Sequence, residues 1–488
     1  MDCPVESRQK QVYTEIEGDE KMCKEKTAGE LLAEQLCYST KDAGEELTQQ
    51  ELERADAFCE DYKHFLNTSK IERAAVRTAI ARLEQNGYRE FDSTEHYQPG
   101  DKVYRNVRGK ALIFATIGTR PLEDGVKLLI SHVDSPRLDL KPNPLYEDSG
   151  IALFKTHYYG GVKKYQWTAV PLALHGTVVR KDGSKLDVAI GEDESDPIFY
   201  ITDLLPHLAK DQMAKTMREG IKAEQLNVLV GSRPYQDEKV KEKVKLNVLR
   251  LLHEKYGLIE ADFLSAELTM VPALKARDVG FDRSMIAAYA HDDKVCAYTS
   301  MMAALEVTSP AYTSVTVFAD KEEVGSEGNT GLDSDFLKIF IEDLCEAQGA
   351  HSRRTLTNSM CLSADVNAAF DPTFPEVTER RNAAFLNRGV VITKYTGSGG
   401  KGGTNDASAE FMYTVRTILD NGNVLWQTGE LGAADQGGGG TVAKYVAHMN
   451  VEVVDVGVPV LSMHAPYELV SKTDVYMTYR AFAEFLKA

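Results

Sequence analysis

The sequence of 488 residues lacks an excess of basic side chains, a long apolar run and any closely spaced pair of cysteines. It carries 56 Lys and Arg against 74 Asp and Glu, which gives a net charge of −18. Nucleic acids and anionic membranes both require a basic face, so we expect neither as a partner. No stretch approaches the ~20 apolar residues that a helical membrane span needs.

The N-terminal segment MDCPVESRQKQVYTEIEGDEK has no apolar core of the kind found in secretory signals, so we do not expect it to be one. The seven cysteines are scattered, and none forms a Cys-x-x-Cys pair. This pattern is typical of free thiols in a reducing compartment rather than of a disulfide framework or a cysteine-type zinc site. We therefore expect a cytoplasmic protein.

The hydrophobic pattern divides the chain into four segments. Residues 1–45 are polar and weakly patterned, which indicates an N-terminal arm. Residues 46–138 and 261–488 alternate strand-like and helix-like runs, and this alternation predicts an α/β fold with three layers, α/β/α, around a mixed, mainly parallel sheet. Residues 139–260 interrupt the alternation with short strand-like pieces and a charged run, DEKVKEKVK, which indicate a β-rich insertion.

Individual elements can be placed within this outline. Thr48 and Ser69 are each followed three residues later by a glutamate, and this capping-box spacing predicts the starts of two helices. Residues 333–348 are expected to form a third helix. The strand-like runs are 111–118, 126–134, 313–320, 389–395 and 451–464.

Histidine, aspartate and glutamate residues occur where the apolar pattern of several strand-like runs stops. Asp292 and Asp293 occur in the same way just before a predicted helix. His132 and Asp134 point the same way, because residues i and i+2 of a strand share a face. In α/β sheets, ligands collect outside the carboxyl ends of the strands. Five segments therefore place two histidines and several carboxylates around one crevice. These residues are His132, Asp134, Asp292, Asp293, Glu322, Glu323, Asp365 and His464.

Each of these residues alone has an ordinary structural explanation. A histidine after a strand is commonly structural, Asp292 suits a helix N-cap, and adjacent glutamates suit a surface turn. Together, however, imidazole and carboxylate groups are ligands of zinc, manganese and cobalt. Two metals about 3.5–4 Å apart need a shared carboxylate and roughly two further ligands each. The set supplies these, with one carboxylate left as a base and one to orient a histidine.

Seven segments carry a resemblance to a known family, and they occur in that family's order. From about residue 50 onward the chain resembles the M18 metallo-aminopeptidases, the group of aspartyl aminopeptidase and vacuolar aminopeptidase I. The resemblance implies removal of N-terminal residues from small peptides and two divalent ions per subunit, zinc first, with cobalt or manganese as alternatives. It also implies a tetrahedral dodecamer in which the insertion, 139–260, packs between subunits. The segments are SHVDSPRLDLKP, AHDDKVCA, DKEEVGS, SADVNAAFDP, VVITKYTG, DQGGGGTVA and DVGVPVLSMHAPYE.

The resemblance also implies a role for each site residue. Glu322 would be the general base, and Asp134 would orient His132. Asp292 would bridge both metals. The remaining metal ligands would be His132 and Asp365 at the first ion and Glu323 and His464 at the second. The substrate-binding residues would be Lys394, Gly438, Gly439, Met463 and Asp371.

Two stretches depart from the members that prefer acidic residues. After the ligand aspartate, those members typically have Met-Ala-His-Ala-Val-His, whereas residues 366–371 are Val-Asn-Ala-Ala-Phe-Asp. Asp371 thus stands where a histidine helps the pocket of an adjacent subunit, and Ala368 replaces another histidine. The run QWTAVP at 166–171 also differs from the family. A carboxylate would repel an acidic side chain, so we expect cleavage after neutral or basic N-terminal residues.

Two alternative functions remain open. A two-metal carboxypeptidase or deacylase would use the same types of ligand, and peptides with blocked N-termini would distinguish it from an aminopeptidase. A self-assembling scaffold or binding protein with a vestigial site is an alternative from another class. The presence of every inferred ligand and of the base argues against the scaffold.

Overall fold

The computed structural model describes residues 26–397 and 399–488, and it divides into two units, residues 1–40 and 41–488. In the first unit, helix α1 (Ala28–Leu36) begins at a capping box formed by Thr27 and Glu30, and it buries none of its residues. The predicted N-terminal arm, 1–45, lies partly outside the described residues, and as a domain it stays a prediction.

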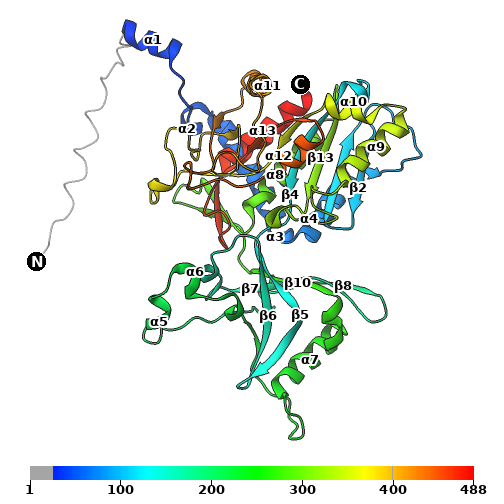
Figure 1. Cartoon of the computed structure of the whole chain (residues 1–488), viewed down its shortest axis with the longest axis vertical. Coiled ribbons are helices and arrows are strands. Elements are labelled where there is room, and N and C mark those ends of the chain that lie inside the picture. The colour runs from blue at the N-terminus through cyan, green and yellow to red at the C-terminus, as the bar shows by residue number, and fades with distance from the viewer. Residues whose placement is uncertain (1–25, 398) are drawn as a thin grey trace, which may run out of the picture. The chain divides into compact units, whose positions relative to one another are not determined.

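The second unit contains a mixed sheet of nine strands (Figure 1). Its central strands β13, β4, β14 and β18 run parallel, and antiparallel pairs join them to the edge strands on both sides. The predicted mixed, mainly parallel sheet is therefore confirmed. In spatial order the strands are β1 (Arg89–Glu90), β2 (Lys102–Val107), β3 (Ala111–Thr116), β13 (Thr313–Ala319), β4 (Val126–His132), β14 (Met360–Ser363), β18 (Glu452–Gly457), β16 (Val390–Thr393) and β17 (Trp426–Thr428).

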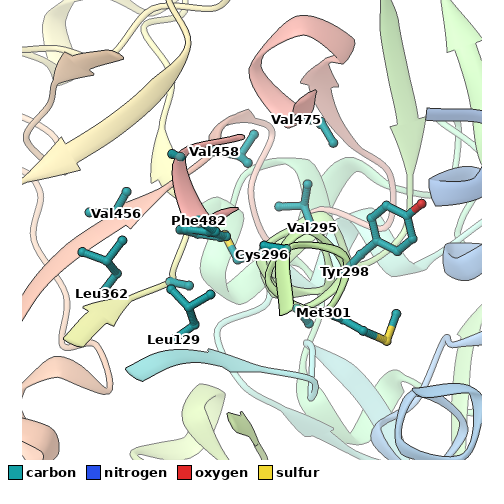
Figure 2. Close-up of a cluster of buried hydrophobic side chains, with 14 of the residues drawn as sticks. Leu129, Val295, Cys296, Tyr298, Met301, Leu362, Val456, Val458, Val475 and Phe482 are labelled. Atoms are coloured by element: carbon teal, nitrogen blue, oxygen red, sulfur yellow. The ribbon is translucent and has the colours of Figure 1, made fainter. Parts of the chain in front are cut away.

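Helices cover both faces of this sheet. Leu129 of β4 packs in one core with α8 and α13, whereas its neighbours Leu128 and Ile130 pack in the other core with α9 and α12. Figure 2 shows the first core, in which Phe482 of α13 lies next to Cys296 of α8 and Leu129 and Leu362 come from the sheet. Alternate strand residues thus fill two cores, which makes the three layers. The helices are α2 (Ala43–Glu46), α3 (Gln49–Thr68), α4 (Glu72–Gln85), α8 (His291–Glu306), α11 (Ala409–Asn421) and α13 (Lys472–Lys487), then α9 (Phe336–Gln348), α10 (Ser352–Thr357) and α12 (Ala443–His448).

A second sheet of six strands has its own core around the fully buried Trp167. Its strands run from Arg137 to Pro272, so they begin before and end after the predicted insertion, 139–260, which stays a prediction as a domain. In spatial order they are β8 (Lys185–Ile190), β7 (Leu172–Val179), β10 (Ala266–Pro272), β5 (Arg137–Asp148), β6 (Ile151–Tyr159) and β9 (Val228–Gly231). The helices beside this sheet are α5 (Lys210–Met213), α6 (Met217–Gly220) and α7 (Lys243–Tyr256) (Figure 1).

A third sheet, of five short strands, carries two segments of the predicted site. Its strand β12 leads into α8, which begins beside Asp292, and His464 lies in the connection between β19 and β20. In spatial order the strands are β11 (Arg277–Val279), β12 (Met285–Ala288), β20 (Glu468–Ser471), β19 (Pro459–Leu461) and β15 (Asn367–Ala368).

The predicted strand-like runs are confirmed as strands, with one difference. The run 451–464 forms two strands, β18 and β19, which belong to different sheets. The capping box at Thr48 is confirmed, because Thr48 accepts a hydrogen bond from the Glu51 N–H at the start of α3. The one at Ser69 is wrong: α4 begins at Glu72 after Ile71, with no side-chain cap. Among the described residues, no helix is long and apolar enough to cross a membrane.

Candidate active site

Three neighbouring parallel strands deliver four of the predicted residues to one edge of the large sheet. His132 ends β4 and is paired in register with Ala319, the last residue of β13. Glu322 and Glu323 follow in a short 3₁₀ turn. Asp365 comes two residues after the end of β14. Because the carboxyl ends of parallel strands coincide, residues from distant parts of the sequence meet there.

Asp292 lies at the centre of the group, between the two histidines. Its Oδ1 atom is 3.2 Å from Nε2 of His132, and its Oδ2 atom is 3.1 Å from Nε2 of His464. The same His132 nitrogen is 3.9 Å from Oδ1 of Asp365, and the same His464 nitrogen is 3.5 Å from Oε2 of Glu323. One carboxylate therefore faces two separate sets of nitrogen and oxygen atoms.

These spacings suit ions held between the side chains. Two ligand atoms bound about 2.0–2.1 Å from a tetrahedral ion are roughly 3.3 Å apart. Among the described residues, two groups of three side chains bring their ligand atoms within 4.8 Å of one another. Both groups contain His132, combined with Asp293 and Asp365 in one and with Asp292 and Glu323 in the other. Asp293, which follows the central aspartate, is thus an additional candidate ligand that the resemblance did not assign.

The carboxylates of this group are buried with too little positive charge. Burial raises the pKa of Glu322 to about 7, and nearby Asp134 and Asp292 reinforce this increase. Burial likewise raises the pKa values of Glu323 and Asp365 well above the ordinary range for carboxyl groups. Bound cations would offset this cost, because an ion is the largest local charge in such a site.

Several buried oxygen atoms of the group also lack a hydrogen-bond partner. They are Oδ1 of Asp292, Oδ1 of Asp293 and Oε1 of Glu323. A buried polar atom without a partner is costly and requires an explanation. Unpaired oxygens, excess carboxylate and two imidazoles together fit divalent metal ions, so the residues present are chemically suited to hold them.

The histidines are protonated more readily than free imidazole in this arrangement. Burial alone lowers the pKa of His132, but the adjacent carboxylates of Asp134 and Asp292, 3.3 and 3.2 Å from its ring nitrogens, outweigh burial, and the pKa rises well above its usual value. For His464, burial is likewise outweighed by the hydrogen bond to Asp292 and by Glu323, and the pKa rises to about 10. Both imidazoles thus lie in a strongly negative field, which would equally attract a metal cation.

Asp134 is fully buried and connects three parts of the site. Its Oδ1 atom is 3.3 Å from Nδ1 of His132, which also lies 3.2 Å from the Asp134 main-chain oxygen. Its two carboxylate oxygens accept hydrogen bonds from the N–H groups of Glu322 and Glu323, each at 3.2 Å. Asp134 is therefore in contact with both the predicted ligand His132 and the loop that carries the two glutamates.

Glu468 is a site residue that the sequence analysis missed. It is buried, and its two oxygens accept the N–H of Asp292 at 3.0 Å and the N–H of His464 at 2.7 Å. Burial raises its pKa to about 8, while these two donors favour its ionised form. Its position at the end of the segment DVGVPVLSMHAPYE, four residues after the histidine, was a signal that could have found it.

A cleft of about 500 Å³ opens beside these side chains. Gly438, Gly439 and Met463 line it, as predicted for substrate-binding residues, together with Leu431 and Lys444. Within the described chain, the lining does not include two other predicted substrate residues, Lys394 and Asp371.

Lys394 and Asp371 have local partners. The Lys394 ammonium contacts Asp406, which Lys401 also contacts at 2.9 Å. The Asp371 Oδ1 atom accepts the N–H of Thr373 at 2.8 Å. A single chain does not bring either side chain to the metal-ligand group, so their roles in substrate binding stay predictions.

Comparison with known proteins places this site in a family. The family model described as "Aminopeptidase I zinc metalloprotease (M18)" matches residues 65–486. A probable M18 family aminopeptidase 1 from Clostridium acetobutylicum is 48% identical over 459 residues, which cover 92% of this chain and 99% of that protein.

Solved structures agree. An M18 family aminopeptidase from Thermotoga maritima superposes with a TM-score of 0.87 at 41% identity, covering 92% of this chain and 99% of that one. Aminopeptidase I from Clostridium acetobutylicum superposes with a TM-score of 0.87 at 45% sequence identity, and the match covers 93% of this chain and 100% of that one. The dodecameric mApe1 of S. cerevisiae, at 20% identity and a TM-score of 0.71 over 90% of this chain and 97% of that one, shares the fold. The chain belongs to the M18 family and is a metallo-aminopeptidase.

Proposed function

We propose that the protein is a two-metal aminopeptidase that removes neutral or basic residues from the N-termini of small peptides. The observation that carries the proposal is the central Asp292, which turns one oxygen to each histidine at 3.2 and 3.1 Å. One ion would be held by His132, Asp292 and Asp365, and the other by Asp292, Glu323 and His464. Zinc is the first candidate, with cobalt and manganese as alternatives.

The proposed chemistry divides between the ions and Glu322. Two bound cations would polarise the scissile carbonyl and lower the pKa of the attacking water. Glu322 takes the proton from that water and then gives it to the leaving amine, acting first as a base and then as an acid. Its carboxylate lies beside the proposed ligands, with Oε2 3.8 Å from Nε2 of His132, which suits a group that exchanges a proton with a water held there.

The neighbouring side chains hold these groups in place. Asp134 fixes the ring of His132 and, through the two N–H groups that it accepts, the turn that carries Glu322 and Glu323. The free α-amine of the peptide would lie among the carboxylates, which limits cleavage to N-terminal residues. Gly438 and Gly439 allow the main chain to approach the substrate closely.

The lining of the cleft supports neutral first residues. Leu431 and Met463 present apolar surface to it, which favours an apolar side chain. Asp371, contributed by an adjacent subunit, would disfavour an acidic one and tolerate a lysine. Lys394 would lie near that carboxylate in the assembled pocket.

We also propose a large homo-oligomer, a tetrahedral dodecamer, with residues 139–260 making much of the contact. Exposed large apolar side chains gather in this segment, and surfaces of this kind are typical of protein interfaces. The related mApe1 is described as a dodecamer. Light scattering at micromolar concentration should give a mass far above that of a 54.1 kDa chain, and a monomer would contradict this part. The exposed residues are Leu204, Leu205, Leu208, Met213 and Met217.

The testing experiment is hydrolysis of aminoacyl anilides by metal-stripped protein, with zinc, cobalt or manganese added back singly. We expect activity to return with metal, at close to two ions per chain. Matched peptides with acetylated N-termini should be left intact. Cleavage of the blocked peptides would favour a carboxypeptidase or deacylase, and no hydrolysis with any metal would favour a scaffold.

A further inference from the structure

A short segment at the end of β6 in the six-stranded sheet, Tyr159-Gly160-Gly161, lies against the metal-ligand group. Each of its three residues lies against a different residue of the site. We propose that this segment is a positioning device: the second sheet contributes it, and both histidine ligands depend on it. The proposal rests on the proposed two-metal function and concerns residues to which no role has been assigned above.

The first contact is made by a buried hydroxyl group. Tyr159 is 8% exposed, and its O–H donates to Oδ2 of Asp134 at 2.8 Å. Asp134 is the carboxylate beside Nδ1 of His132, so the tyrosine fixes the group that orients this ligand. The guanidinium of Arg137 lies over the Tyr159 ring at 4.2 Å from its centroid and holds the ring in place.

The second contact is made by a main-chain carbonyl two residues later. The Gly161 oxygen lies 2.9 Å from Nδ1 of His464. A neutral imidazole that donates from Nδ1 presents the lone pair of Nε2, the atom that faces Asp292. Metal-binding histidines commonly need such a partner on the other ring nitrogen, which fixes the tautomer and the ring orientation.

The third contact explains the glycine between them. Gly160 has a φ of +75°, and a Cβ atom there would lie 3.2 Å from Oε2 and 3.3 Å from Cβ of Glu323. The main chain is therefore packed directly against a proposed ligand of the second ion. A side chain at this position would displace Glu323, in addition to straining the backbone.

These contacts link the two sheets mechanically. Tyr159 acts on the first histidine through Asp134, Gly161 acts directly on the second, and Gly160 limits the position of Glu323. The three residues are consecutive, so a displacement of β6 moves all three contacts together. The placement of the six-stranded sheet therefore controls the geometry of both proposed metal sites.

Two pairs of variants test this inference. Tyr159→Phe removes only the hydroxyl, and its control is Tyr158→Phe, an adjacent tyrosine of the same strand that is 40% exposed. Gly160→Ala is paired with Gly150→Ala at the other end of β6. Gly150 has a φ of +76° and nothing within 4 Å of an added Cβ, so both alanines strain the backbone alike, but only one meets Glu323.

The readouts are zinc retention in buffers of graded free zinc, kcat and KM on a leucine anilide, and the melting temperature. We expect Tyr159→Phe and Gly160→Ala to weaken zinc retention or kcat by about 10–100-fold, the range found when an outer partner of a metal ligand is lost. KM should change less than about twofold. Tyr158→Phe and Gly150→Ala should match the unmodified protein in zinc retention and kcat.

Unchanged zinc retention and kcat in Tyr159→Phe, or equal losses in the two alanine variants, would overturn the inference. If Tyr159→Phe does not fold, the alanine pair still decides. An unmodified protein that binds zinc but cleaves no aminoacyl anilide would contradict the proposed function instead. Zinc retention would then still test the positioning role.

Discussion

Two clusters of charged side chains in the described part of the chain, one buried at the active site and one only partly buried around Glu192, are built in opposite ways. In the active-site cluster, carboxylates outnumber basic groups, and buried oxygens of Asp292 and Glu323 have no hydrogen-bond partner. In the second cluster, a single carboxylate, Glu192, meets His175 at 2.8 Å and Lys70 at 2.7 Å through one oxygen and Lys275 at 2.8 Å through the other.

The difference distinguishes a structural cluster from a binding cluster. Glu192 follows β8, while Lys70 lies between α3 and α4 and also donates to the Pro272 carbonyl at 2.7 Å, so this cluster connects the six-stranded sheet to the helices. Its charges are satisfied within the protein. The active-site cluster is satisfied only when cations are added. Excess charge and unpaired atoms therefore mark the functional site more clearly than burial alone.

The largest expected effect is at the proposed base. Glu322→Gln keeps the shape of the side chain but cannot accept a proton. We expect kcat to fall by about 10²–10⁴-fold, the usual contribution of general acid–base catalysis. Zinc content, measured by elemental analysis, should not change, because the adjacent Glu323 is the proposed ligand. Normal turnover, or loss of an ion, would mean that the two glutamates have been assigned in the wrong order.

A substitution in the cluster around Glu192 should lower the free energy of unfolding and leave kcat unchanged. Glu192→Gln leaves Lys70 buried without its counter-charge, and breaking a buried ion pair costs on the order of 3 kcal/mol. Despite burial, His175 and Lys70 lower the pKa of Glu192 to about 2. Since this folded-state pKa lies below 4.5, the ordinary value for a glutamate, the contribution to stability is present above about pH 4.5 and is lost toward pH 2.

Urea unfolding of metal-free protein at several pH values measures this contribution. The difference in the free energy of unfolding between the unmodified protein and Glu192→Gln should be largest at pH 7 and should shrink as the pH falls. Glu194→Gln, at an exposed neighbouring position, is the control and should change little. A gap that stays constant down to pH 2 would show that the charge of Glu192 is not its source.

Much of the large sheet could be predicted from sequence, whereas the contacts between sheets could not. Buried parallel strands leave continuous apolar runs, so β4 and β13 were visible, and His132 and Glu322 followed from where those runs stop. The predicted helix cap at Ser69 was wrong because a capping-box spacing also occurs by chance. Helix α4 begins at Glu72 without a side-chain cap. Tyr159 acts through its contact with Asp134 and Glu468 partly through its contact with Asp292, both distant in sequence, and no local pattern records such contacts. For Glu468 the only available signal was its place in the last of the family segments, four residues after His464.

Glu468 lies in the active-site cluster but differs from its neighbours Asp292 and Glu323, because each of its carboxylate oxygens accepts a hydrogen bond from a main-chain N–H. Glu468→Gln retains one acceptor and places an amide N–H₂ against either the N–H of Asp292 or that of His464. We expect zinc retention to weaken by roughly 10–100-fold, as for other outer partners of metal ligands. Competition with a chelator measures this change, and the intact retention of Glu192→Gln serves as the reference. Equal retention in the two variants would limit Glu468 to a structural role.

The smallest expected effect concerns the side chain that the enzyme prefers. Opposite unit charges ~4 Å apart near a surface interact by roughly 4 kcal/mol at an effective dielectric constant of about 20. A change of sign at one pocket residue can therefore alter preference by tenfold or more, since ~1.4 kcal/mol corresponds to a factor of ten. We predict a higher kcat/KM for leucine and lysine anilides than for the aspartate anilide, with Asp371→His narrowing the gap by about tenfold.

The structure makes this a test of assembly as well as of charge. Within one chain, the Asp371 carboxylate accepts a hydrogen bond from Thr373 and does not line the cleft, so its effect requires a neighbouring subunit. The substitution should therefore change specificity in the oligomer and leave the zinc retention of the metal-ligand cluster unaltered. If the unmodified enzyme prefers the aspartate anilide, Asp371 does not face the substrate pocket, and the acidic preference implied by the resemblance to aspartyl aminopeptidase extends to this chain.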